Sequence, residues 1–151
     1  MTLAQPSLIL LVEDSDDDLA FIMRAFKRAE VRAEVEVLRD GEAAIRWLSE
    51  RLDQSPAAHL PSVILLDLKL PRRSGLEVLA WIKNQSGLTG TPVCILTSSD
   101  EPRDISQAYA LGANSYLLKP GGPEGLTELV RAVSEYWCGL NRLLHRRRDQ
   151  K

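Results

Sequence analysis

Residues 63–67 read Val-Ile-Leu-Leu-Asp, an apolar run followed at once by a carboxylate. A short apolar run without polar alternation is typical of a strand that is buried on both faces, as in a parallel sheet. Similar runs occur at 8–12, 35–38, 93–96 and 116–118. Glu36 interrupts the second of these runs and indicates a more exposed edge strand. The sequence therefore predicts five strands, most of them buried.

Segments with helical spacing lie between these runs. Acidic residues 16–18 favour a helix start, and the apolar positions that follow them are Leu19, Ile22, Met23 and Phe26. Asp40 and Ser74 are placed as N-caps of a second and a third helix, and Pro102 opens a fourth. The fifth helix carries one apolar stripe, made of Leu126, Leu129, Val130, Val133, Trp137 and Leu140. This alternation predicts a three-layer α/β domain, with helices on both faces of one parallel sheet.

Length and composition fit one domain with a real core, since the 151 residues are 44% hydrophobic and 26% charged. We expect a short tail at 1–7, the domain at 8–140 and a basic tail at 141–151. The formal net charge of −2 argues against bulk electrostatic binding to nucleic acid or anionic lipid. Without a signal peptide pattern or a membrane-length apolar stretch, the expected location is cytoplasmic, with Cys94 and Cys138 as free thiols.

Polar residues follow four of the predicted strands, where doubly wound sheets bind their ligands. These residues are Glu13, Asp14, Asp67, Thr97 and Lys119. Carboxylates held close together repel each other, so their convergence indicates a bound cation or a raised pKa. A few carboxylates with open water positions are the usual arrangement for Mg²⁺. Lys119 and Thr97 could stabilise a phosphoryl anion, and Asp67 is the best candidate nucleophile. Together the residues predict phosphoryl transfer to a carboxylate.

Four motifs carry a resemblance to a known family. LLVEDS at 10–15, LLDLKLPRRSG at 65–75, ILTSS at 95–99 and SYLLKP at 115–120 resemble the successive site motifs of the receiver domain of bacterial response regulators. The resemblance covers about residues 6–140. Within the family, the stretches at 97–105, 108–116 and 135–137 are most similar to the phytochrome-associated response regulators, which consist of a receiver alone. The resemblance implies a CheY-like, flavodoxin-like (β/α)5 topology with strand order 2-1-3-4-5.

The same resemblance implies a role for each site residue. Asp67 would be the phospho-acceptor, Lys119 the phosphate-contacting lysine, Thr97 the switch hydroxyl and Tyr116 the switch aromatic residue. The implied metal is Mg²⁺, with Mn²⁺ as a possible substitute, and its ligands would be Glu13, Asp14, Asp67 and the backbone carbonyl of Lys69. Lys69 stands where the family frequently has asparagine, and we predict that it alters the lifetime of the phosphoryl group without preventing phosphorylation.

The partners implied are a phytochrome-like sensor histidine kinase and a histidine phosphotransfer protein. A homodimer is expected through the face of the fourth helix, fifth strand and fifth helix, with no membrane or nucleic-acid partner and no output segment after the fifth helix. Such a protein is a signalling switch and not a turnover enzyme. Two alternatives stay open: a receiver-like scaffold that dimerises without phosphorylation, and an aspartyl-phosphate phosphohydrolase, whose class places an acid where this chain has Lys69. The role of the basic tail from His145 to Arg148 also stays open.

Overall fold

The computed structural model describes residues 6–54 and 59–143. Five parallel strands form one sheet in the order β2-β1-β3-β4-β5, as predicted. The strands are β1 (Leu8–Val12), β2 (Glu34–Leu38), β3 (Val63–Leu66), β4 (Val93–Thr97) and β5 (Ser115–Leu118). The helices are α1 (Asp16–Arg28), α2 (Gly41–Leu52), α3 (Gly75–Lys83), α4 (Pro102–Ala110) and α5 (Pro123–Ser134). A 3₁₀ turn, η1 (Ser86–Leu88), precedes β4, and a π-helical segment, η2 (Glu135–Leu140), continues α5.

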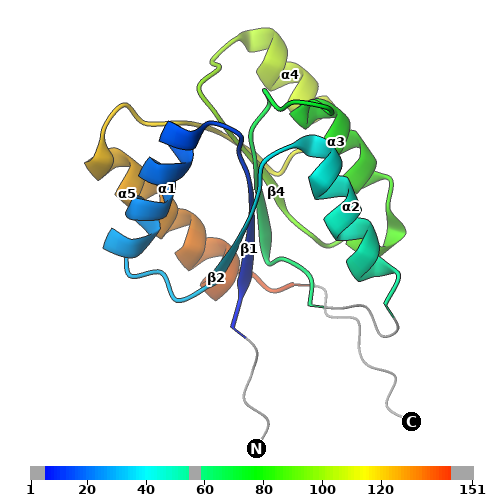
Figure 1. The fold of residues 1–151 in the computed structure, drawn as a ribbon, viewed down its shortest axis with the longest axis horizontal. Helices are drawn as coiled ribbons and strands as arrows, with labels where there is room; N and C mark the ends of the chain where they lie inside the picture. The colour runs from blue at the N-terminus through cyan, green and yellow to red at the C-terminus, as the bar shows by residue number, and fades with distance from the viewer. Residues whose placement is uncertain (1–5, 55–58, 144–151) are drawn as a thin grey trace, which may run out of the picture.

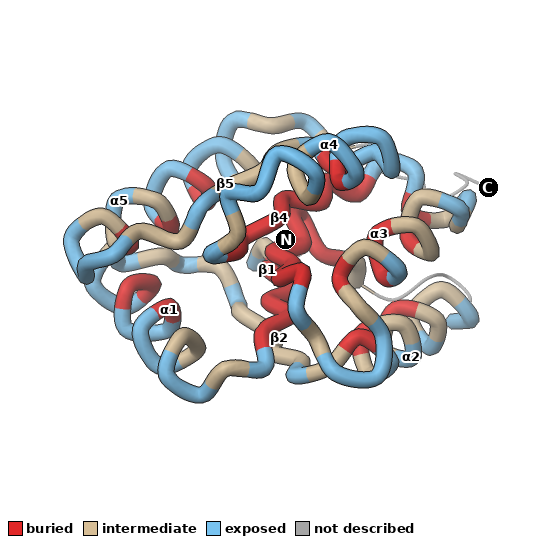
Figure 2. Tube along the Cα trace, turned by 90° about the horizontal axis from the view of Figure 1, so that it is seen from above, coloured by how far each residue is buried: buried red, intermediate tan, exposed pale blue. Residues whose placement is uncertain are grey.

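Helices cover both faces of the sheet, with α1 and α5 on one side and α2, α3 and α4 on the other (Figure 1). Successive residues of a strand point to opposite faces, so each central strand contributes to two cores. In β1, Ile9 and Leu11 pack in the core beneath α1 and α5, while Leu10 and Val12 pack in the core beneath the other helices. The red, buried segments at the centre of Figure 2 are these strands. This two-sided burial explains the unbroken apolar runs of the sequence.

The predicted helix starts are confirmed at three places. The side chain of Asp40 accepts a hydrogen bond from the backbone N–H of Ala43 at 2.7 Å, which makes it the N-cap of α2. Ser74 caps α3 in the same way, by accepting from the N–H of Glu77 at 3.2 Å. Pro102 occupies the first turn of α4, where its missing N–H costs nothing. These caps fix where each helix leaves the edge of the sheet that carries the candidate site.

Two details differ from the sequence-based expectation. The predicted stripe of the fifth helix runs to Leu140, but α5 ends at Ser134 and the wider π-helical segment that follows turns Leu140 outward, to 74% exposure. Met23, expected on the buried face of α1, lies at the edge of that face and is exposed. The causes differ, because the apolar stripe of α1 is narrower than ideal helical spacing predicts, whereas Leu140 follows a change of helix type.

The structure describes both cysteines but not the basic residues near the C-terminus. Cys94 and Cys138 are free cysteines, as predicted, with Cys94 buried. In the described part of the chain, no helix is both long enough and apolar enough to cross a bilayer. The basic residues His145 to Arg148 lie outside the described residues, so their role stays open.

Candidate functional site

The sheet register brings the predicted residues to one edge. Val12 of β1 pairs with Leu66 of β3, so Glu13 and Asp67 follow neighbouring strands at the same level. The backbone N–H of Asp67 donates to the carbonyl of Val12 at 3.1 Å, which continues the ladder past the strand ends. On the other side of β3, the backbone N–H of Lys119 donates to the carbonyl of Thr97 at 2.8 Å. Main-chain pairing alone therefore aligns the ends of four strands, as the sequence predicted.

The Lys119 ammonium lies at the centre of this edge. Its Nζ is 2.5 Å from Oε1 of Glu13 and 3.0 Å from Oδ2 of Asp67. A third carboxylate, Oδ2 of Asp18, lies 2.8 Å from the same nitrogen. The side chains of Lys119 and Asp67 are each 10% exposed and that of Glu13 is 2% exposed, so these charges are largely shielded from water. One ammonium thus holds three carboxylates together.

The pKa shifts at this cluster follow from its geometry. Burial raises the pKa of Glu13, and the contact with Lys119 and the N–H of Ser15 offset that effect only in part. Burial alone would lower the pKa of Lys119, but the hydrogen bonds to Asp18 and Glu13 outweigh it, so that pKa is raised. Lys119 is therefore firmly cationic, whereas Glu13 carries its charge at a cost. The cluster keeps an excess of negative charge.

The Asp67 carboxylate is fixed by donors on both of its oxygens. The backbone N–H of Leu68 donates to Oδ1 at 2.7 Å, and Lys119 donates to Oδ2. Gly75, the first residue of α3, packs its Cα against the carbonyl of Asp67 and donates its N–H to the carbonyl of Leu68 at 2.8 Å. A Cβ at position 75 would overlap the Asp67 carbonyl oxygen. The close approach of α3 therefore requires glycine and sets the position of Asp67.

Thr97 and Tyr116 lie on the neighbouring strands. Thr97 is buried, and its hydroxyl accepts a long hydrogen bond from the N–H of Ser99 at 3.4 Å. The Tyr116 hydroxyl donates to the carbonyl of Ser99 at 2.7 Å, and the Ser99 hydroxyl donates to Asp104 at 2.6 Å. Burial raises the pKa of Tyr116, so its hydroxyl is a donor at neutral pH. These bonds tie the loop between β4 and α4 to the Tyr116 ring.

Two predicted residues lie farther from the ammonium, and one that the prediction omitted lies against it. Asp14 is exposed, and the contact at this position is a hydrogen bond from Arg39 to its backbone carbonyl at 3.2 Å. Lys69 is exposed as well. The sequence pattern gives Asp18 only the role of a helix-start charge, although this residue lies on the first turn of α1, the helix that follows β1. The N-cap serine at position 15 was the signal for its placement, since Ser15 accepts from the N–H of Asp18 and thereby fixes this first turn.

The donor set suits a hard divalent cation. It consists of carboxylate oxygens, and one ammonium does not neutralise the three carboxylates that it contacts. Among residues 6–54 and 59–143, however, no three histidine, cysteine, aspartate or glutamate side chains are arranged as a ready metal cage. Glu13 and Asp67 point their oxygens at Lys119 instead. The residues therefore fit a divalent cation chemically, and the side chains of Glu13 and Asp67 would have to turn from the Lys119 ammonium to the ion.

The sequence matches the family described as the response regulator receiver domain over residues 9–131. The chain belongs to this family. It is 44% identical over 137 residues to the probable methanogenesis regulatory protein FilR2 of Methanothrix harundinacea, covering 91% of this chain and 87% of that protein. It is 38% identical over 134 residues to the response regulator Rcp1 of Synechocystis, covering 87% of this chain and 89% of Rcp1.

Solved structures support the same assignment. The phosphorylated cyanobacterial phytochrome response regulator RcpA superposes with a TM-score of 0.82 at 35% identity, covering 93% of this chain and all of the RcpA chain. The Mn²⁺-bound form of the response regulator Rcp1 superposes with a TM-score of 0.79 at 36% identity, covering 93% of this chain and 100% of the Rcp1 chain. This receiver domain is thus close to the phytochrome response regulators in both sequence and structure. Its family consists generally of signalling switches.

Proposed function

We propose that this protein is a phospho-accepting signalling switch in a two-component pathway. An oxygen of Asp67 attacks the phosphorus of a phosphohistidine on a sensor kinase. The bond from phosphorus to the imidazole nitrogen breaks, the nitrogen keeps the electron pair, and an acyl phosphate forms on Asp67. The observation that supports this proposal is the Asp67 carboxylate itself, which is shielded from water, held by donors on both oxygens and in contact with a fixed ammonium.

A divalent cation completes the proposed site. Glu13, Asp14, Asp67 and the backbone carbonyl of Lys69 would hold Mg²⁺ or Mn²⁺, and the ion would supply positive charge to the phosphoryl oxygens. The support is the excess of negative charge around Lys119, the raised pKa of Glu13 and the Mn²⁺-bound form of the relative Rcp1. Lys119 donates to the transferred group, and the buried Thr97 hydroxyl adds a further donor.

The proposed switch runs from Thr97 to the face of α4, β5 and α5. A phosphoryl group adds a charge of about −1.5 to −2 at the strand end and attracts the Thr97 hydroxyl. Movement of Thr97 changes the space beside the Tyr116 ring, whose hydroxyl holds the loop before α4 through Ser99. The exposed apolar side chains of this face make it suited to a homodimer. They are Tyr109 on α4 and Leu118 on β5, together with Leu111 at the end of α4 and Tyr136 and Leu140 on η2, which continues α5.

The proposed partners are a sensor histidine kinase that supplies the phosphoryl group, and a phosphotransfer protein that relays it, in the cytoplasm. Rcp1 and RcpA favour a phytochrome kinase, whereas the name of FilR2 points to a different pathway. A phosphotransfer assay from an autophosphorylated phytochrome kinase distinguishes the phytochrome pathway from a different one. Acetyl phosphate is the positive control for the acceptor. Fast transfer from the phytochrome supports that pairing, and transfer no faster than from an unrelated histidine kinase contradicts it.

The chemistry is tested by intact mass. The protein is incubated with acetyl phosphate and Mg²⁺, beside Asp67→Asn and beside Asp100→Asn, which removes an exposed carboxylate near the end of β4. Wild type and Asp100→Asn should gain one phosphoryl group and Asp67→Asn should gain none. Equal labelling of Asp67→Asn would contradict the proposal. Loss of labelling on removal of Mg²⁺ tests the metal separately.

A second candidate function is a scaffold that dimerises without phosphorylation. Apolar side chains on and next to α4, β5 and α5 are exposed, and Leu140 and Tyr136 on η2 are among the most exposed. Sedimentation of Asp67→Asn distinguishes the two functions. A dimer that forms equally well in this variant and in phosphorylated wild type favours the scaffold.

A further inference from the structure

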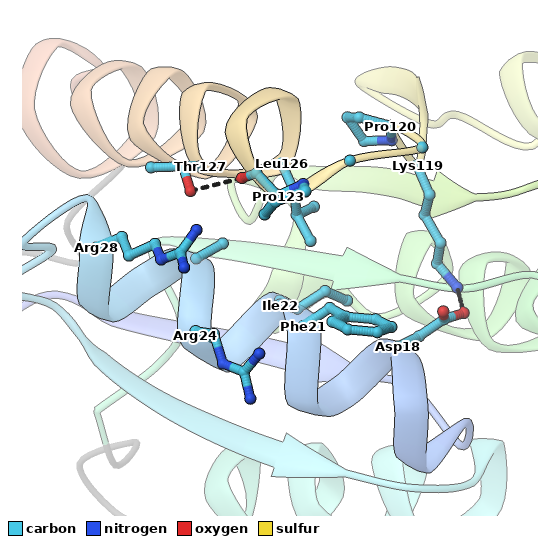
Figure 3. Close-up of a pocket in the computed structure, with 13 residues that line it drawn as sticks. Asp18, Phe21, Ile22, Arg24, Arg28, Lys119, Pro120, Pro123, Leu126 and Thr127 are labelled. Carbon is cyan, nitrogen blue, oxygen red and sulfur yellow. Dashed lines mark hydrogen bonds and ion pairs between the residues drawn. The ribbon is translucent and has the colours of Figure 1, made fainter.

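Asp18 is anchored on the first turn of α1. The Ser15 hydroxyl oxygen accepts from the Asp18 backbone N–H at 3.2 Å, which leaves the Asp18 side chain free to reach across to β5. There its Oδ2 accepts a hydrogen bond from Nζ of Lys119 at 2.8 Å. Figure 3 shows this bond at one end of the groove between α1 and the start of α5. The contact joins residues 101 positions apart in the chain.

The donors of Lys119 are fully engaged. A lysine ammonium has three N–H groups, and three carboxylates surround this one: Glu13, Asp18 and Asp67. A phosphoryl group on Asp67 brings further acceptor oxygens to the same place. Glu13 and Asp67 are also the side chains that would turn toward a bound ion, so Asp18 is the carboxylate that would still compete with the phosphoryl oxygens for Lys119.

Asp18 is the partner that can leave at the lowest cost. Its side chain is 37% exposed, whereas those of Asp67 and Glu13 are 10% and 2% exposed. A carboxylate that faces water replaces a lost hydrogen bond with solvent, but a buried one does not. Asp18 also borders a cavity of about 260 Å³, together with Phe21 and Pro120, so its carboxylate has open space to move into.

We infer that Asp18 is a positioning residue that holds Lys119 while Asp67 is unmodified and releases it when a phosphoryl group arrives. Asp18 then competes with the phosphoryl group for Lys119 and sets how readily the protein enters its phosphorylated state. This inference rests on the proposed phosphorylation of Asp67. It assigns to the first turn of α1 a part in the switch that is separate from Thr97 and Tyr116.

The test uses Asp18→Asn with Asp17→Asn as the matched control, because Asp17 lies on the same turn, carries the same charge and is exposed. Beryllium fluoride in the presence of Mg²⁺ serves as a phosphoryl mimic, and its affinity is measured by titration. Asp18→Asn should bind it about threefold to fivefold more tightly than wild type, the range expected for one partly exposed ion pair. Asp17→Asn should differ from wild type by less than about twofold, since its charge is screened by water.

A second readout needs neither metal nor phosphoryl mimic. In metal-free protein, the NMR signal of the Lys119 ammonium should shift in Asp18→Asn and stay in place in Asp17→Asn. The role of Asp18 is overturned if Asp18→Asn binds beryllium fluoride no more tightly than wild type does, or if the Lys119 signal is unchanged in this variant. In that case, binding of the mimic by wild type still supports the proposed function. Failure of wild type and both variants to bind the mimic overturns the proposed function, and the Asp18 inference with it.

Discussion

Replacing Lys119 with methionine removes the ammonium that three carboxylates share and keeps most of the apolar stem of the side chain. Glu13 and Asp67 would then be left with their oxygens close together and little access to water, at 2% and 10% side-chain exposure. Leaving a buried charge without its partner costs about 3–5 kcal/mol. Asp18 adds little to this loss of stability, because its more exposed carboxylate can be hydrated.

We therefore predict that Lys119→Met lowers the free energy of unfolding by about 3–5 kcal/mol at pH 7 in metal-free buffer. With a urea m-value of about 2 kcal/mol/M for a domain of this size, the midpoint should fall by about 2 M. Lys83→Met is the matched control. Lys83 is also a partly buried lysine, but its side chain donates to the neutral amide of Asn114 at 3.0 Å, and burial lowers its pKa.

The pH dependence gives the sign of the effect. The folded-state pKa of Lys119 is raised, so its contribution is fully present below the pKa of the unfolded chain and is lost only as the pH rises through the higher folded value. At acid pH the carboxylates lose their charge first. The difference between wild type and Lys119→Met should therefore shrink as the pH falls through the raised pKa of Glu13.

A double variant checks that electrostatics is the cause. Adding Asp67→Asn to Lys119→Met removes one of the stranded charges and should recover part of the lost stability. Urea unfolding followed by circular dichroism measures all four proteins. A loss under about 1 kcal/mol for Lys119→Met, or an equal loss for Lys83→Met, would refute the reasoning, since the first value is typical of an exposed ion pair.

Three further changes have defined outcomes. Glu13→Gln should raise the free energy of unfolding at pH 7 by about 0.5–2 kcal/mol. The raised pKa means that the charged form destabilises the fold, so in urea titrations this gain should be absent below the unfolded pKa, grow as the pH rises above it and level off above the raised folded pKa. Gly75→Ala should abolish or strongly slow labelling by acetyl phosphate, because the added Cβ displaces the Asp67 backbone; labelling at the wild-type rate would contradict this packing. Lys69→Asn should change the half-life of the phosphorylated protein and leave its extent of phosphorylation unaltered, and an identical half-life would show that position 69 has no influence.

Much of the fold was predictable because the signals were local. The unbroken run at 63–66 reports burial on both faces, and caps such as Ser74 report helix starts within a few residues. The end of α5 was not predictable in this way. The change to a π-helical segment after Ser134 leaves the apolar pattern of the sequence intact, although it turns Leu140 to solvent.

In the candidate site, the residues that follow strands could be predicted from local signals, and Asp18 could not. Glu13, Asp67 and Lys119 follow strands directly, so the alignment of strand ends in a parallel sheet sufficed to bring them together. Asp18 reaches the same ammonium from a helix, and its position depends on the direction in which α1 leaves β1. Ser15 marks the start of α1, but an N-cap alone does not show which of the three aspartates that follow it contacts Lys119. Tertiary geometry makes that choice.

The position of the phosphoryl group is the most direct test of the whole account. After labelling with acetyl phosphate and Mg²⁺, borohydride reduces an aspartyl phosphate to homoserine, and peptide mass spectrometry locates the converted residue. The account predicts homoserine at position 67 alone. Conversion at position 14 or 18, or a phosphoryl group on a residue outside this edge of the sheet, would contradict it.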